Sequence, residues 1–112
     1  MADDGKIPLG DIGSRILFED DEIRIWELRL GPGEESVPHR HTCDYVIVDV
    51  AGDKIAAKSV PGYASEYGDY IEAPVEQGRT VFLQQGSVET AANVGDKPYR
   101  NVLVEFKDTA RG

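Results

Sequence analysis

The 112-residue sequence is poor in cysteine and in positive charge. Cys43 is its only cysteine, which excludes an internal disulfide and fits a reducing compartment. Twelve lysines and arginines stand against twenty-one acidic residues, which gives a net charge of −9. No basic surface is therefore available to neutralise the phosphates of a nucleic acid or of an anionic membrane, and neither is expected as a partner.

Long hydrophobic runs are also missing. No apolar stretch approaches the roughly 18 residues that are needed to cross a bilayer. The first residues, MADDGKIPLGDIGS, lack the basic segment followed by an apolar segment that is typical of a signal peptide. These absences predict a cytoplasmic protein.

The length and the hydrophobic content of 40% match one globular domain with a single core. Residues 1–14 are polar and contain glycine, so we expect a flexible N-terminal arm. Residues 15–112 are expected to form the domain. This division gives one folded unit and no linker.

Apolar and polar residues alternate along many short stretches, which is the period of a β-strand rather than of a helix. The stretches are residues 14–20, 21–30, 44–52, 54–60, 71–74, 79–86, 87–93 and 99–108. The acidic residues 19–22 are expected to form a hairpin turn, and residues 62–73 could hold one turn of helix. Seven to nine short strands separated by turn residues predict an all-β sandwich or barrel.

The two histidines of the chain, His39 and His41, lie together in the segment PHRHTCDY. On a regular strand alternate side chains share a face, so both imidazoles, followed by Cys43 and Tyr45, are expected on one face. Two imidazoles so placed inside a barrel lie close enough to share one metal ion. A pair of histidines with this spacing is by itself a weak signal, because a solvated strand can carry it without any function.

The residues around this pair form a longer pattern. Gly33, His39, His41, Tyr45 and Gly52 follow one another with spacings of five, one, three and six residues. The pattern resembles the first signature of the cupin superfamily, G-x5-H-x-H-x3–4-E-x6-G, with Tyr45 at the position of the glutamate.

A second pattern occurs further along the chain. Gly78, Gln84, Gly86, Glu89 and Asn93 have the spacing of the second cupin signature, G-x5-P-x-G-x2-H-x3-N. Gln84 stands at the proline position and Glu89 at the histidine position. Two signatures in the right order are far more specific than either alone, and together they cover roughly residues 15–107.

The resemblance implies a small jelly-roll barrel, the double-stranded β-helix, and is closest in character to small stand-alone bacterial cupins, including those associated with β-alanine degradation. In cupins the signature histidines and glutamate bind a divalent metal inside the barrel. Carried over position by position, the ligands would be His39, His41 and Glu89, with Tyr45 at the fourth place. Two histidines and one carboxylate form the facial triad of non-haem Fe(II), and the same set suits Zn, Mn, Ni or Co.

Several roles stay open for these residues. Tyr45 is a candidate catalytic residue, as a general acid or a hydrogen-bond donor to a metal-bound ligand, and it could equally be an aromatic wall. Glu89 could instead mark a cupin that has lost its metal. Cys43 could be a soft ligand or a small buried hydrophobic residue. The expected substrate pocket contains Arg24, Trp26, Cys43 and Phe82.

The resemblance therefore favours a metal-dependent enzyme, of the dioxygenase, lyase or isomerase type, that acts on a small carboxylate- or carbonyl-bearing metabolite. The alternative is a non-catalytic cupin that binds or senses a small ligand, with or without metal. A homodimer formed by exchange of edge strands is also expected, since residues 1–20 could supply an unpaired strand.

Overall fold

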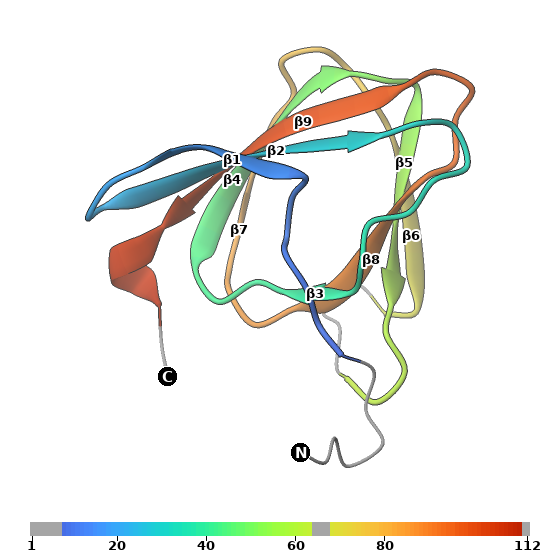
Figure 1. Cartoon of the computed structure of the whole chain (residues 1–112). Coiled ribbons are helices and arrows are strands. Elements are labelled where there is room, and N and C mark those ends of the chain that lie inside the picture. Colours follow the sequence, from blue (N-terminus) through green and yellow to red (C-terminus); the bar gives the residue numbers. More distant parts are fainter. Residues whose placement is uncertain (1–7, 64–67, 111–112) are drawn as a thin grey trace.

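The computed structural model describes residues 8–63 and 68–110 (Figure 1). This part of the chain contains nine strands and one short 3-10 helix. They are β1 (Arg15–Glu19), β2 (Ile23–Leu30), β3 (His39–Arg40), β4 (Asp44–Ala51), β5 (Lys54–Ser59), β6 (Tyr70–Pro74), β7 (Thr80–Leu83), β8 (Val88–Asn93), β9 (Tyr99–Phe106) and η1 (Lys107–Thr109). In the described residues no helix is long and apolar enough to cross a membrane.

The strands form two antiparallel sheets that face each other across the core (Figure 1). The larger sheet has the strand order β1-β2-β9-β4-β7 and the smaller one has the order β3-β8-β5-β6. In the smaller sheet β8 pairs with β3 and with β5, both distant from it in sequence, as the winding of a jelly roll requires. The predicted all-β jelly-roll barrel is confirmed.

The alternation in the sequence sets which side chains enter the barrel. Along β9 the residues alternate strictly between buried and half-buried positions, and Leu103 is one of the buried set. Leu103 pairs with Trp26 of β2 and with Ile47 of β4, so the inner face continues across three strands. Trp26, Leu103 and Tyr45 form a buried cluster that Ile12 completes.

Ile12 belongs to the segment predicted as a flexible arm, residues 1–14. The structure describes this segment from residue 8 on, and residues 1–7 lie outside the described residues. The described part packs against the barrel. The Gly10 N–H donates to the Pro38 carbonyl at 2.8 Å, and the Ser14 N–H donates to the Glu27 carbonyl at 2.7 Å.

The predicted hairpin turn at residues 19–22 joins β1 to β2. The Asp20 carboxylate closes it by accepting the backbone N–H groups of Glu22 and Ile23, both at 2.8 Å. Because β1 pairs with β2 in the same chain, residues 15–19 are not the unpaired segment that strand exchange was expected to use. The helical turn considered for residues 62–73 partly falls on residues 64–67, outside the described part, and β6 occupies the range from Tyr70 on.

The glycines at both ends of the first signature, and both glycines of the second, have positive φ angles. Gly52 combines two constraints. Its φ is +141°, and a Cβ added there would lie 2.9 Å from the Tyr99 ring. Only glycine meets both conditions without strain, which explains why the turn after β4 begins with this residue.

Asn93, the last residue of the second signature, has a structural role. Its side-chain amide donates to the Leu30 carbonyl at 3.0 Å and to the Lys97 carbonyl at 2.8 Å. Its side-chain oxygen accepts the Gly95 N–H at 3.0 Å. The buried amide thus satisfies backbone groups of the turn between β8 and β9 and links that turn to the end of β2.

Candidate metal centre

The pairing of β3 with β8 brings the two signatures together. His39 lies directly opposite Glu89 in the antiparallel register, so their side chains share a face. The next segment is held by two backbone hydrogen bonds, from the His41 N–H to the Ser87 carbonyl at 3.0 Å and from the Gly86 N–H to the His41 carbonyl at 2.7 Å. Residues some fifty positions apart are thereby fixed against each other.

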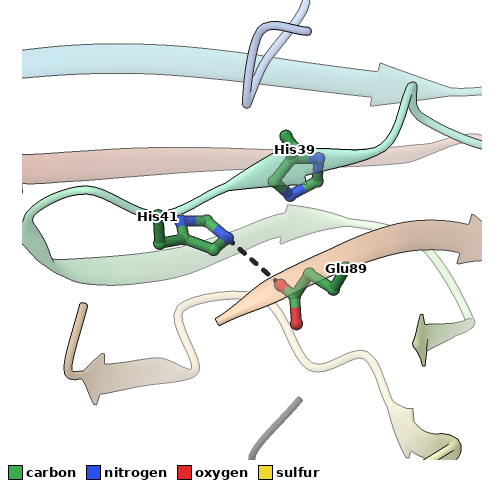
Figure 2. Close-up of side chains that lie close together, drawn as sticks. All are labelled: His39, His41 and Glu89. Atoms are coloured by element: carbon green, nitrogen blue, oxygen red, sulfur yellow. Dashed lines mark hydrogen bonds and ion pairs between the residues drawn. The ribbon is translucent and has the colours of Figure 1, made fainter. Parts of the chain in front are cut away.

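His39, His41 and Glu89 converge inside the barrel, and all three are buried (Figure 2). One ligand atom from each lies within 4.8 Å of the others. The His41 Nε2 is 3.2 Å from the Glu89 Oε1. The two imidazole rings meet edge to face, with centroids 4.9 Å apart. The residues that the sequence singles out as metal ligands therefore meet in one cluster; that they bind a metal stays a prediction.

The tautomer of His39 is fixed by its neighbour. Its Nδ1 lies 2.9 Å from the Val37 carbonyl oxygen, which only accepts, so Nδ1 carries the proton. The Nε2 of the neutral ring then has a free lone pair, as a metal ligand requires. Burial, and next to it the neighbouring His41, lower the pKa of His39 below its ordinary value and so favour this neutral form.

Tyr45 holds the ring of His41. The two rings are stacked, with centroids 3.9 Å apart and an angle of 11° between their planes. β3 ends at Arg40 and β4 begins at Asp44, so the strand is not regular from His39 to Tyr45 as the parity argument assumed. The shared burial of these side chains nevertheless persists, and Tyr45 is fully buried. The contact gives the aromatic-wall role a structural basis, and the catalytic role stays a prediction.

The donor set fits a divalent transition metal. Such ions bind nitrogen and oxygen at about 2.0–2.2 Å, so two ligands of one ion are at most about 4.4 Å apart. The distance of 3.2 Å between the His41 Nε2 and the Glu89 Oε1 already satisfies this limit. All ligand atoms of the cluster lie within 4.8 Å of one another, so a shift of a few tenths of an ångström would bring every pair within the limit. Among the described residues, the buried His41 Nδ1 and Glu89 Oε2 have no hydrogen-bond partner.

Two residues of the expected substrate pocket are committed to a buried carboxylate. The Arg24 Nε donates to the Glu105 Oε1 at 2.6 Å, and the Trp26 Nε1 donates to the same oxygen at 2.7 Å. The hydrogen bond to Glu105 raises the pKa of Arg24. The guanidinium of Arg24 and the indole of Trp26 thus supply hydrogen bonds to the buried carboxylate of Glu105.

The other two residues of that expected pocket lie apart. Cys43 is buried and outside the histidine–glutamate cluster, and burial raises the pKa of its thiol. Phe82 is 59% exposed and stacks on Phe106 with ring centroids 6.2 Å apart. The structure does not bring Arg24, Trp26, Cys43 or Phe82 to the cavity that borders the cluster.

That cavity lies between the two sheets and has a volume of about 200 Å³. Glu89 forms part of its wall, and apolar side chains such as Ile47 and Leu83 form much of the rest. Asp49 and Asn101 also line it, and sequence reasoning missed both. Strand parity contained the signal, because Asp49 shares the inward face of β4 with Tyr45.

Comparison with known proteins identifies the fold. No protein-family model matches the chain, and no curated protein matches its sequence. Solved structures do match, among them a cupin domain from Bordetella pertussis Tohama I, with 22% identity, a TM-score of 0.72 and coverage of 91% of this chain and 98% of that one.

Two further solved structures share the fold. A conserved Klebsiella pneumoniae protein with a double-stranded β-helix domain is 18% identical, with a TM-score of 0.63 and coverage of 96% and 89%. The polyketide cyclase RemF from Streptomyces resistomycificus is 16% identical, with a TM-score of 0.57 and coverage of 78% and 56%. At these identities the likeness concerns the fold: the chain has the cupin fold, as its two signatures predicted.

Proposed function

We propose that this protein is a metal-binding cupin and an enzyme that acts on a small carboxylate- or carbonyl-bearing metabolite. His39, His41 and Glu89 would hold one divalent transition metal, and the donor set suits Fe, Zn, Mn, Ni and Co alike. The observation that carries the proposal is the convergence of three buried donors from two distant segments, with the His39 tautomer already set for ligation.

The buried charge of Glu89 supports the presence of a cation. Its Oε1 contacts His41, but its Oε2 has no hydrogen-bond partner among the described residues. A carboxylate removed from water without full compensation is costly, and a metal ion supplies both positive charge and a ligand bond.

Three protein ligands leave coordination positions for a substrate, and a bound ion would polarise its carbonyl oxygen or stabilise developing negative charge. The residues of the chain supply the surroundings. Val37 orients the ring of His39, and Tyr45 fixes the plane of His41 by stacking. The cavity beside Glu89 is large enough for a small metabolite and has mostly apolar walls.

Tyr45 is proposed as the residue that handles or orients a proton. It occupies the position of the cupin glutamate and lies in ring contact with a proposed ligand. A phenol is a poor metal ligand at neutral pH, so a role beside the ion suits it better than a role on the ion.

A second candidate function is non-catalytic binding of a small ligand or sensing. The observation in its favour is the contact of 3.2 Å between His41 and Glu89, which is a satisfactory hydrogen bond without any cation. The barrel would then use the same cavity to hold a ligand, and the residues of the cluster would shape its polar end.

We also propose a cytoplasmic homodimer that associates through the edge strand β1. This strand lies at the edge of the larger sheet, and its residues Ile16, Leu17 and Phe18 are among the exposed large hydrophobic side chains. Exposed apolar edges favour pairing with another chain. Sedimentation velocity of the wild type and of Leu17→Lys tests this proposal: a monomeric wild type contradicts it.

The metal is tested first by elemental analysis of protein purified without chelator, followed by titration of the stripped protein with Zn²⁺ or Ni²⁺. We expect one ion per chain and loss of binding in His39→Ala and Glu89→Ala. Glu22→Ala removes an exposed carboxylate of the hairpin turn and is the matched control. A protein that takes up no metal, or variants that bind as well as the wild type, would favour the non-catalytic alternative.

A second experiment addresses the reaction. Oxygen uptake by iron-loaded protein is measured with a panel of small carboxylic and oxo acids. Uptake that His41→Ala abolishes indicates a dioxygenase. Turnover of the same acids without oxygen uptake points to lyase or isomerase chemistry.

A further inference from the structure

A second polar cluster, formed by Asp49, Tyr99 and Asn101, lies inside the barrel away from the histidines. All three residues are at most 5% exposed, and all three line the cavity that Glu89 borders. Asp49 on β4 lies opposite Asn101 on β9 in the antiparallel register, and these two strands run side by side (Figure 1). Polar side chains at inward-facing positions of a small barrel require a reason, because burial without partners is costly.

The hydrogen bonds within this cluster leave one acceptor over. The Tyr99 hydroxyl donates to the Asp49 Oδ1 at 3.2 Å, and the Asn101 Nδ2 donates to the Tyr99 oxygen at 2.9 Å. A phenol has a single proton, so once it is given to the carboxylate the phenol oxygen must accept from the amide. This order directs the Asn101 Oδ1 away from the chain of bonds, and in the described residues this buried oxygen has no partner.

The second cluster is separated from the proposed metal ligands along the length of the barrel. Asp49 follows Tyr45 by four residues on β4, a separation of roughly 13 Å along a strand. The wall between the two ends is apolar and includes Ile47, Val81 and Leu83. The cavity therefore has polar groups at Glu89 and at the second cluster, and a mostly apolar wall that also carries Glu72 and Arg79.

We infer that the cavity binds a small elongated metabolite whose far end carries a hydrogen-bond donor, a hydroxyl or an amino group, that is recognised by the Asn101 Oδ1 beside Asp49. The inference rests on the proposed function for the near end, where a carboxylate or carbonyl would face the ion. The separation of roughly 13 Å fits a ligand with a main chain of about six carbons, counting the carboxylate carbon, between the ion and the Asn101 Oδ1. A volume of about 200 Å³ restricts the ligand to a molecule of metabolite size.

The polar end favours a donor over an acid. Asn101 Oδ1 and the carboxylate of Asp49 both accept hydrogen bonds, and the proton of Tyr99 is already donated. Arg79 also lines the cavity, but its Nη1 donates to the Pro74 carbonyl at 3.1 Å in the connection between β6 and β7. A ligand with an anionic group at its far end would therefore place that group against hydrogen-bond acceptors. The test must distinguish such a ligand from one that carries a donor.

The test uses three probes of equal chain length, hexanoate, 6-hydroxyhexanoate and adipate, with the full chain loaded with Zn²⁺. Binding is followed by two-dimensional NMR. We expect 6-hydroxyhexanoate to bind about fivefold tighter than hexanoate, as one added hydrogen bond allows, and tighter than adipate. The side-chain amide signals of Asn101 should shift with 6-hydroxyhexanoate and stay in place with hexanoate, a readout that needs no variant.

Two variants complete the test. Asn101→Leu keeps the approximate size of the side chain and removes the acceptor, so the affinity ratio of the two probes should fall to about one. Ser87→Ala is the matched control, because it removes a different buried side-chain oxygen that has no partner in the described residues, at a position outside the cavity wall. The ratio should persist in Ser87→Ala.

The outcomes distinguish this inference from the proposed function. A chain that binds no metal but still prefers the hydroxyl probe retains the distal site and fails the metal proposal. A metal-loaded chain with equal affinities for hexanoate and 6-hydroxyhexanoate, with a preference for adipate, or with no binding of any probe at the solubility limit overturns the distal site and leaves the metal proposal standing.

Discussion

Replacement of Glu89 by glutamine should affect the metal-free and the metal-loaded protein in opposite directions. Glutamine has nearly the shape of glutamate and can still hydrogen-bond to His41, but it carries no charge. In the metal-free protein the wild-type carboxylate is buried with one oxygen that lacks a partner in the described chain. Removing such a charge relieves a desolvation cost, so the free energy of unfolding should rise by about 1 kcal/mol or more.

In the presence of metal the order reverses. A ligand at 100 times its dissociation constant stabilises the folded state by about 2.7 kcal/mol, which for a chain of this size corresponds to a rise in melting temperature of roughly 10 °C. Glu89→Gln removes a charged ligand and should lose most of this rise. Urea denaturation with and without Zn²⁺ measures both quantities, and Glu22→Gln is the exposed control.

One pattern of stabilities would contradict a role of Glu89 as a metal ligand. If the metal-free Glu89→Gln protein is less stable than the wild type, and added Zn²⁺ stabilises both proteins equally, Glu89 is a structural partner of His41 and not a metal ligand. A gain in metal-free stability without any response of the wild type to metal would retain the electrostatic argument and reject the ion.

Three further predictions concern single residues. Tyr45→Phe should keep metal affinity within about twofold in a calorimetric titration, because the stacking on His41 is retained, whereas a loss of binding would place the phenol oxygen on the ion. Gly52→Ala should lower the free energy of unfolding by about 2–4 kcal/mol in urea, because it combines a strained φ with a close approach to Tyr99, and an unchanged midpoint would contradict the packing described at that turn. The hydrogen bonds of Glu27 with Arg15 and Arg100 lower the pKa of its carboxyl from 4.5 to about 2, so its contribution to stability is complete above pH 4.5 and is lost as the pH falls toward 2. Unfolding measured across that range should be less pH-dependent in Glu27→Gln, and an identical pH profile would show that the carboxyl titrates alike in both states.

The fold and the cluster of His39, His41 and Glu89 could be predicted from the sequence, because both follow from residue patterns and spacing. Period-two alternation located the strands, and the signature spacing placed His39, His41 and Glu89 in one cluster. The cluster of Asp49, Tyr99 and Asn101 could not be predicted, because Asp49 and Asn101 come together only when β4 pairs with β9 in this register.

Residues that the sequence suggested for the substrate pocket lie elsewhere in the structure. Arg24 and Trp26 were expected in a substrate pocket, yet both donate hydrogen bonds to Glu105, whose position opposite Arg24 is set by the strand register. Phe82 lies on the outward parity of its strand, opposite Val46. Pairing across strands, which a single sequence does not display, decides such cases.

The hydrogen bonds that tie Gly86 and Ser87 to His41 have a consequence for the order of assembly. The proposed ligands His39, His41 and Glu89 come from segments that meet only when the distant strands of the jelly roll have paired. An unfolded chain therefore contains no preformed metal site. An ion would then bind after the barrel has folded. In a zinc finger, by contrast, folding depends on the metal. Treatment with a strong chelator should accordingly leave a folded, less stable barrel with its amide protection largely intact.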